Sequence, residues 1–198
     1  ASFLYMETST TFGHVCGLAI YERPTPEFDP YATVYERFGA LVGLAEPMRR
    51  KLVEVPFSLD HPYWIDDADF DLEYHVRHIG LAPPGGADQL TEQVSRIVGR
   101  QMDRTRPLWE VYVIEGLADG RWAMLTKLHH ATIDGAAGVI LLNMLTSTDP
   151  DAPAPEPKEW KGEHPPSQSE LLQYTLQHLA TNPVKGMRLQ LKLVRNLA

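Results

Sequence analysis

Residues 109–114 and 122–128 carry apolar side chains on both faces of an extended chain. Strands of this kind are typical of the centre of a sheet that is covered on both sides. Asp119 and Gly120, which separate the two segments, form a turn signal. The sequence therefore predicts a central hairpin whose second strand leads into the histidines at positions 129 and 130.

Further strands and helices are predicted before this hairpin. Residues 13–21 predict a buried strand, and residues 31–42 predict a helix that ends at Gly43. Residues 87–102, which follow a Pro-Pro-Gly-Gly loop, predict an amphipathic helix. The apolar face of that helix is expected to consist of Leu90, Val94, Ile97, Val98 and Met102.

Extended segments are predicted at residues 51–55, 63–65 and 72–79, where prolines and Asp-rich turns interrupt the chain. These segments indicate a further sheet. Residues 135–145, which follow the two histidines, have almost no polar face and predict a buried helix.

The carboxy-terminal third of the chain differs in composition. Residues 149–166 contain six prolines among acidic and small residues, which predicts an extended, exposed connector. Residues 181–198 predict an amphipathic basic helix, which would lie on an anionic lipid surface or pack on other protein. Its apolar and basic rows are Val184, Met187, Leu191 and Val194, and Lys185, Arg188, Lys192 and Arg195.

Charge and composition narrow the class of protein. The 198 residues are 43% hydrophobic and carry a net charge of -8, which is unlike a protein that neutralises nucleic-acid phosphates. No apolar stretch is long enough to span a membrane, and no secretory signal is visible. The single cysteine, Cys16, cannot form an internal disulfide. We expect a cytoplasmic protein without a nucleic-acid partner.

The residues that suggest chemistry are His129, His130, Asp134 and Gly135. Side chains alternate along a strand, so the two rings are expected to point in opposite directions where the strand ends. Asp134 stands where the buried helix begins, and Gly135 permits a tight turn. An isolated His-x-x-x-Asp spacing is more often structural, with the aspartate capping the helix.

The full spacing His-His-Ala-Thr-Ile-Asp-Gly resembles the active-site motif of a superfamily of acyltransferases. That superfamily includes chloramphenicol acetyltransferase, peptide-synthetase condensation domains and the wax ester synthase/diacylglycerol acyltransferases. The Arg-Pro-Leu-Trp segment at residues 106–109 resembles the last of these families in particular. So do His-Pro-Tyr-Trp at residues 61–64 and the segment of residues 69–76. The resemblance covers most of residues 3–145.

The resemblance implies roles for individual residues. His130 would be the general base, which suits an imidazole because histidine titrates near neutral pH. Asp134 would organise the loop through an arginine, for which Arg104 and Arg106 are the candidates. His129 would brace the site, and Gly135 would permit the close turn.

The resemblance also implies one lobe of a two-lobed, mixed α/β fold, with a mixed sheet flanked by helices and the active site between the lobes. Residues 1–148 would form the amino-terminal lobe, residues 149–168 a linker, and residues 169–198 a helical crossover toward a carboxy-terminal lobe. That second lobe would be the chain's partner, either in the same polypeptide or as a separate cleaved chain.

The implied function is transfer of a fatty acyl group from acyl-CoA, a co-substrate, to diacylglycerol or a long-chain alcohol, with no permanently bound cofactor. A condensation-like enzyme with a carrier-bound donor is one alternative. A non-catalytic lipid-binding or lipid-droplet protein is another, and peripheral contact with a membrane or droplet is compatible with both enzyme and binding protein.

Competing sites find less support. The sequence lacks the Gly-rich and Gly-x-Ser-x-Gly motifs of nucleotide-binding proteins and hydrolases. His75 and His78 do not predict a metal site, because an odd separation on a strand places the rings on opposite faces. Cys16 is expected to pack in the core. His14 either approaches the site or is simply hydrogen-bonded.

Overall fold

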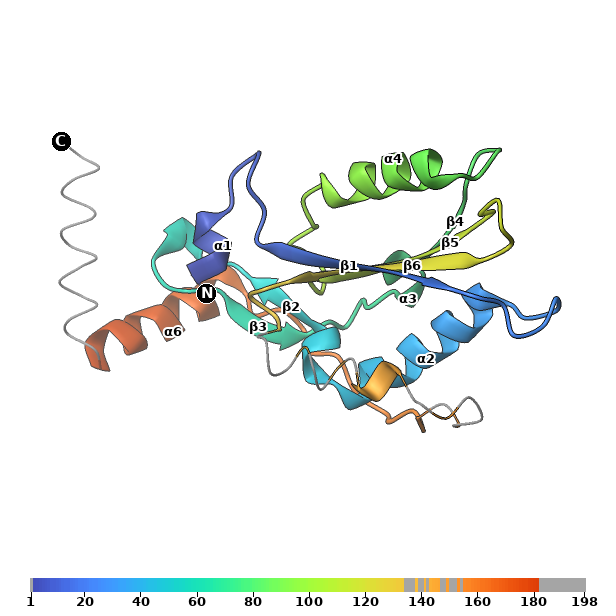
Figure 1. Ribbon diagram of the computed structural model, residues 1–198. Coiled ribbons are helices and arrows are strands. Elements are labelled where there is room, and N and C mark those ends of the chain that lie inside the picture. The colour runs from blue at the N-terminus through green and yellow to red at the C-terminus, as the bar shows by residue number, and fades with distance from the viewer. Residues whose placement is uncertain are drawn as a thin grey trace.

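The structure is a computed structural model that describes residues 2–133, 138, 141, 143–146, 149, 153 and 155–181. It is a mixed α/β fold in which a mixed sheet lies between helices (Figure 1). The helices are α1 (Ser2–Met6), α2 (Pro30–Leu44), α3 (Leu72–His75), α4 (Ala87–Val98) and α6 (Gln168–Thr181). The strands are β1 (His14–Tyr21), β2 (Arg50–Val53), β3 (Tyr63–Asp66), β4 (Val76–Gly80), β5 (Trp109–Glu115) and β6 (Trp122–His129).

The main sheet has the strand order β1-β6-β5-β4. β5 and β6 form an antiparallel hairpin at its centre, which confirms the prediction for this part of the chain. β1 pairs antiparallel with β6, whereas β4 runs parallel to β5. The connection from β4 to β5 contains α4, as a parallel pair requires. β2 and β3 form a separate antiparallel pair.

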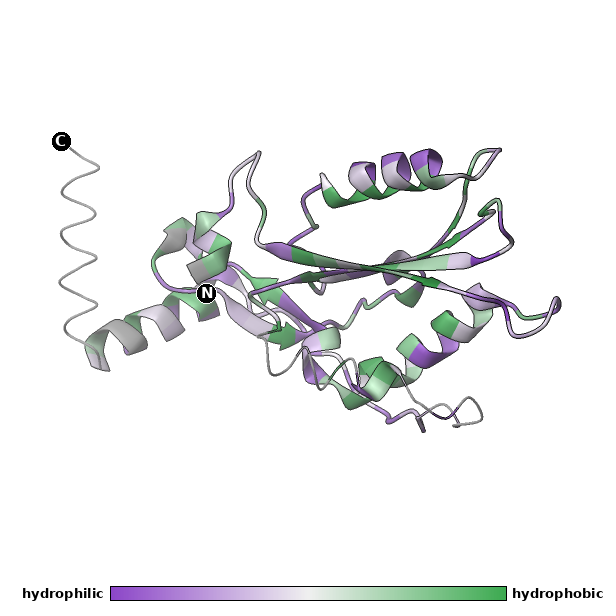
Figure 2. Cartoon of the chain, viewed as in Figure 1, coloured by the Kyte–Doolittle hydropathy of each residue, from purple (hydrophilic) through white to green (hydrophobic). Residues whose placement is uncertain are grey.

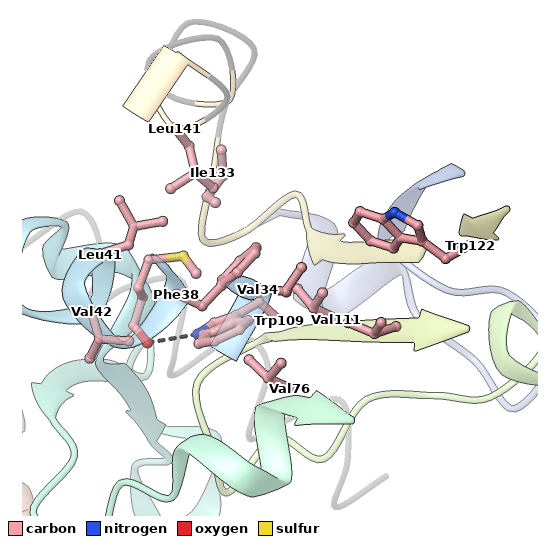
Figure 3. Close-up of a cluster of buried hydrophobic side chains, with 12 residues drawn as sticks. Val34, Phe38, Leu41, Val42, Val76, Trp109, Val111, Trp122, Ile133 and Leu141 are labelled. Carbon is pink, nitrogen blue, oxygen red and sulfur yellow. Dashed lines mark hydrogen bonds between the residues drawn. The ribbon is translucent and has the colours of Figure 1, made fainter. Parts of the chain in front are cut away.

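The residues of β5 supply both faces of the sheet with apolar side chains. Val111 and Val113 belong to a buried cluster with Phe38 and Leu41 of α2, shown in Figure 3. Tyr112 and Ile114 of β5 belong to a second cluster, which also contains Leu90 and Ile97 of α4. Trp109 begins the strand, and its indole N–H donates to the carbonyl of Met48 at 2.6 Å. The alternation explains why both faces of the hairpin are apolar.

Helix α4 lies along the sheet with its apolar side facing the strands and its hydrophilic side facing away (Figure 2). Leu90 and Ile97 of this helix are buried. The helix ends at Val98, four residues earlier than predicted, because Gly99 occupies its carboxy-terminal cap. Met102 therefore lies outside the helix and packs in a third cluster. That cluster consists of Leu4, Leu52, Met102 and Leu108.

Strand β1 forms as predicted, but the prediction that it is buried is wrong. Val15, Leu18 and Ile20 are 43–45% exposed. β1 is an edge strand of the sheet, and these residues lie outside the clusters beneath α2 and α4. Cys16 is exposed as well, so the expectation that it packs in the core is also wrong.

Residues 72–75 were expected to be extended, whereas they form α3. The carboxylate of Asp71 accepts the backbone N–H groups of Glu73 at 3.0 Å and Tyr74 at 3.3 Å. An aspartate at this position stabilises the first turn of a helix. The local cap therefore outweighs the β-like pattern, and the strand begins only at Val76.

Gly43 lies inside α2 and does not end it. A Cβ at this position would overlap the carbonyl of Lys158, so the glycine permits close approach of the segment at residues 155–167. That segment has almost no regular secondary structure and is mostly exposed. Trp160 nevertheless packs edge-on against Phe70, and Glu163 N donates to the carbonyl of Asp66 at 2.8 Å.

The predicted helix at residues 135–145 lies largely outside the described residues, although positions 138, 141 and 143–145 are helical. The predicted basic helix at residues 181–198 also lies outside them, except for Thr181. The first part of the predicted crossover, residues 169–181, is helical because it lies within α6. The division into lobe, linker and crossover stays a prediction.

Candidate active site

The two adjacent histidines lie where β6 ends. His129 is the last residue of the strand and pairs with His14 of β1. The side chain of His129 is only 2% exposed, whereas His130 is exposed. The two rings therefore enter different surroundings, as alternation along a strand predicts.

Both ring nitrogens of His129 form hydrogen bonds within the protein. Nδ1 accepts the backbone N–H of Ala131 at 2.9 Å, so the proton of the neutral ring lies on Nε2. Nε2 donates it to Oε1 of Glu7 at 3.1 Å. Burial lowers the pKa of His129, although the Glu7 carboxylate opposes that effect. His129 is thus a neutral ring with no free lone pair.

Glu7 is the buried carboxylate of this site, with its side chain 3% exposed. Its oxygens accept from Gly13 N at 2.8 Å, Arg104 Nη2 at 2.7 Å, Arg104 Nε at 3.2 Å and Gln101 Nε2 at 3.3 Å, besides His129. Burial alone would raise the pKa of Glu7, but these hydrogen bonds outweigh it and lower the pKa to about 2. The carboxylate is therefore charged at neutral pH.

The surroundings of His130 are different. Its backbone N–H donates to the carbonyl of Gly13 at 2.9 Å. Its ring stacks on Phe3, with the ring centroids 4.9 Å apart and the planes at 22°. Within the described part of the chain, the nitrogens of this ring have no hydrogen-bond partner. An exposed imidazole of this kind can accept a proton from a bound molecule.

The two candidate arginines have separate partners. Arg104 binds Glu7, as above, and its Nη2 donates to the carbonyl of Leu4 at 2.6 Å. Arg106 lies over the ring of Tyr74, 4.1 Å from its centroid. Asp134 and Gly135 lie outside the described residues, so their roles, and a contact of either arginine with Asp134, stay predictions.

His14 lies opposite His129 where β1 pairs with β6, and its Nε2 forms a hydrogen bond with the carbonyl of Val98 at 2.9 Å, so it both approaches the site and is hydrogen-bonded. The remaining candidates lie elsewhere. His75 is buried, with Nδ1 on the carbonyl of Trp109, whereas His78 is exposed and pairs with Glu115. Among the described residues, no group of three His, Cys, Asp or Glu side chains could hold a metal ion.

A cavity of about 420 Å³ opens beside the turn that follows His130. Among the described residues, its lining is mostly apolar and includes Leu44, Ala45, Glu46, Pro47, Ile133, Leu141 and Met144. Ile133 belongs to the His-His-Ala-Thr-Ile-Asp-Gly segment, and its N–H donates to the carbonyl of His129 at 3.3 Å. An apolar cavity lined by a residue of this segment suits a substrate with a hydrocarbon chain.

Sequence reasoning did not identify Glu7, Gly13 or Phe3 as part of this site. Glu7 and His129 are 122 positions apart, and no periodic pattern or motif connects them. The sequence pattern predicts only that Gly13 begins a strand. A lone glutamate near the start of a chain gives no signal that separates it from a surface residue.

Comparison with known proteins identifies the family. The family model for the wax ester synthase/diacylglycerol acyltransferase catalytic domain matches residues 1–198. The chain belongs to this family. A protein of Mycobacterium tuberculosis H37Rv named as the diacylglycerol O-acyltransferase Rv1760 is 42% identical over 167 residues, which are 82% of this chain and 33% of that protein. Another named tgs3, from the same strain, is 36% identical over 172 residues, or 87% of this chain and 63% of that protein.

Solved structures agree with this membership. The wax ester synthase/diacylglycerol acyltransferase of Marinobacter aquaeolei VT8 superposes with a TM-score of 0.66 at 33% identity, over 79% of this chain and 39% of that one. The starter condensation domain of rhizomide synthetase RzmA gives a TM-score of 0.54 at 13% identity, over 70% of this chain and 31% of that one. The second match concerns the fold alone. The chain spans about one third of the first relatives' length.

Proposed function

We propose that this wax ester synthase/diacylglycerol acyltransferase chain carries the base of an O-acyltransferase. The enzyme moves a fatty acyl group from acyl-CoA to the hydroxyl of diacylglycerol or a long-chain alcohol. His130 accepts the hydroxyl proton as the oxygen attacks the thioester carbonyl. The carbon–sulfur bond then breaks, the thiolate of coenzyme A takes the proton, and an ester and free coenzyme A are released. No covalent bond to the enzyme is required.

The observation that carries this proposal is the contrast between the two rings of the motif. His129 uses both nitrogens within the protein, whereas His130 presents an exposed ring at the end of β6. Only the second ring is therefore available to take a proton from a substrate. The apolar cavity beside Ile133 supports a substrate with a hydrocarbon chain.

The proposal includes a second lobe. The chain spans about one third of the length of the first relatives, and a family member of solved structure is also much longer than the matched region. We propose that the remaining polypeptide completes the binding of acyl-CoA and acceptor. Among the described residues no helix is long and apolar enough to cross a membrane. Contact of residues 181–198 with a lipid surface remains part of the proposal.

The test is the release of free coenzyme A from palmitoyl-CoA, with diacylglycerol or hexadecanol as acceptor, by the full-length protein and its His130→Ala variant. We expect a loss of about 10²–10⁴-fold in kcat, the usual contribution of a positioned base. His164→Ala is the matched control, because His164 is an exposed histidine of the connector. It should keep the wild-type rate.

Equal release by wild type and His130→Ala would remove His130 from catalysis. A protein that binds acyl-CoA without turnover would favour the lipid-binding alternative. Activity only with a carrier-bound donor would favour the condensation-like alternative.

A further inference from the structure

We propose that Glu7 is a positioning residue of this enzyme, whose buried carboxylate holds the backbone of His130 in place without touching substrate. The inference rests on the proposed function for its effect on rate. Its structural part, the hold on residues 130 and 131, stands by itself. Two hydrogen-bonded paths lead from the same carboxylate oxygen, Oε1 of Glu7, to these residues.

The first path runs through the other histidine of the motif. Oε1 of Glu7 accepts Nε2–H of His129 at 3.1 Å, and Nδ1 of that ring accepts the N–H of Ala131 at 2.9 Å. If the carboxylate were absent, the ring could place its proton on either nitrogen. A proton on Nδ1 would turn this acceptor into a donor facing another donor. Glu7 therefore fixes the tautomer that holds the residue after His130.

The second path runs through the backbone. The same Oε1 accepts the N–H of Gly13 at 2.8 Å, and the carbonyl of Gly13 accepts the N–H of His130 at 2.9 Å. A Cβ on Gly13 would lie 2.9 Å from Nε2 of His129, so the two paths are packed directly against each other. The amides of His130 and Ala131 are thus both connected to one oxygen atom.

The guanidinium of Arg104 compensates the negative charge of Glu7 at the second carboxylate oxygen, Oε2. Oε2 accepts two N–H groups of Arg104, at 2.7 and 3.2 Å, and the amide of Gln101 at 3.3 Å. A buried carboxylate without such partners would be costly. The guanidinium fixes the orientation of the carboxylate and leaves Oε1 directed at the motif. Arg104 thereby acts through Glu7.

The experiment uses the full-length protein with Glu7→Ala, Glu7→Gln and Glu92→Ala. Glu92 is the matched control, because it is 64% exposed and forms a surface ion pair with Arg96 on α4, away from the motif. For Glu7→Ala we expect kcat to fall by about 10²-fold, the effect of misplacing a catalytic group by roughly an ångström, with a much smaller change in KM for palmitoyl-CoA. Glu7→Gln keeps an oxygen acceptor but loses the charge, so its kcat should lie between those of Glu7→Ala and wild type.

Amide hydrogen exchange at residues 130 and 131 is measured on the same variants. We expect faster exchange at both positions in Glu7→Ala, with amides in the centre of β5 unchanged. Unchanged exchange at both positions would overturn the proposal, as would a kcat per folded molecule equal to that of Glu92→Ala. If wild type turns over but His130→Ala does so equally well, the proposed function fails, and the exchange result still decides whether Glu7 holds the motif.

Discussion

Strand β6 carries buried polar groups in two regions that serve different purposes. Two residues before the end of the strand, Lys127 is 1% exposed and pairs across the hairpin with Glu110. It donates to the carbonyl of Ile97 in the last turn of α4 and to that of Arg100 just after the helix. At the end of the strand, His129 is 2% exposed and bonds Glu7 and the turn that contains His130.

The difference lies in what each group holds. Lys127 donates to the carbonyl of Ile97, which also accepts the backbone N–H of Arg100, and to the carbonyl of Arg100, and so holds the end of α4 against the sheet. The pair of Glu7 and His129 instead fixes backbone N–H groups beside an exposed imidazole. Burial of a charged or titratable group therefore does not by itself mark a catalytic site. Its bonded partners distinguish the two regions.

The largest effect on stability is expected at Lys127. Lys127→Met should lower the free energy of unfolding by about 3–5 kcal/mol, because it leaves the Glu110 carboxylate buried without its nearest cation. The midpoint of denaturant unfolding measures this, with Lys158→Met, an exposed lysine, as control. The folded fraction should keep its kcat. A loss of kcat per folded molecule would break the distinction between the two regions.

The contribution of Glu7 to stability should depend on pH. The folded pKa of Glu7 is about 2 against an ordinary 4.5, so the charged carboxylate contributes stability above pH 4.5 that is lost as pH falls toward 2. The contribution is roughly 3 kcal/mol. Denaturant unfolding of wild type and Glu7→Gln between pH 7 and pH 2 should show a difference that shrinks over this window. A difference independent of pH would contradict the assignment.

A smaller effect is expected from Gly13→Ala. The added Cβ would lie 2.9 Å from Nε2 of His129 and 3.4 Å from the carbonyl of Phe3. Such overpacking costs about 1–3 kcal/mol, and displacement of His129 should also lower kcat. Gly80→Ala is the control, because a Cβ there has no atom within 4 Å. Equal kcat values for both variants would show that the ring of His129 can move without consequence.

The smallest effect is expected from Phe3→Leu, which removes the ring stacked on His130. Aromatic pairs of this kind contribute about 0.5–1.5 kcal/mol, so kcat/KM should fall by no more than roughly tenfold. Phe57→Leu is the control, because Phe57 is 87% exposed. A loss as large as that expected for His130→Ala would show that Phe3 does more than orient the ring.

The hairpin and its helices could be predicted from the sequence because alternate residues of one strand face different helices. Val111 and Val113 pack toward α2, and Tyr112 and Ile114 pack beneath α4. The exposure of β1 could not be predicted in this way. Its sequence is as apolar as a central strand, and position at the edge of a sheet is a property of the assembled fold.

The site was predictable only where it is continuous in sequence. The opposite surroundings of His129 and His130 follow from alternation along β6. Glu7 follows α1 and lies 122 positions before His129 in the sequence. Its carboxylate is held by N–H donors of Gly13, Gln101 and Arg104, and no local sequence pattern predicts that these groups meet. The prediction that α3 would be a strand failed for a local reason, because the Asp71 cap outweighs the apolar pattern.

The central claim is that the two histidines of the motif have different roles, and chemical rescue tests it most directly. Free imidazole is added to the His130→Ala and His129→Ala variants of the full-length protein, and acceptor-dependent release of coenzyme A is measured. The account predicts that imidazole restores part of the activity of His130→Ala, because it replaces an accessible base, and none of that of His129→Ala, whose ring is buried. Rescue of His129→Ala, or failure to rescue His130→Ala, would contradict it.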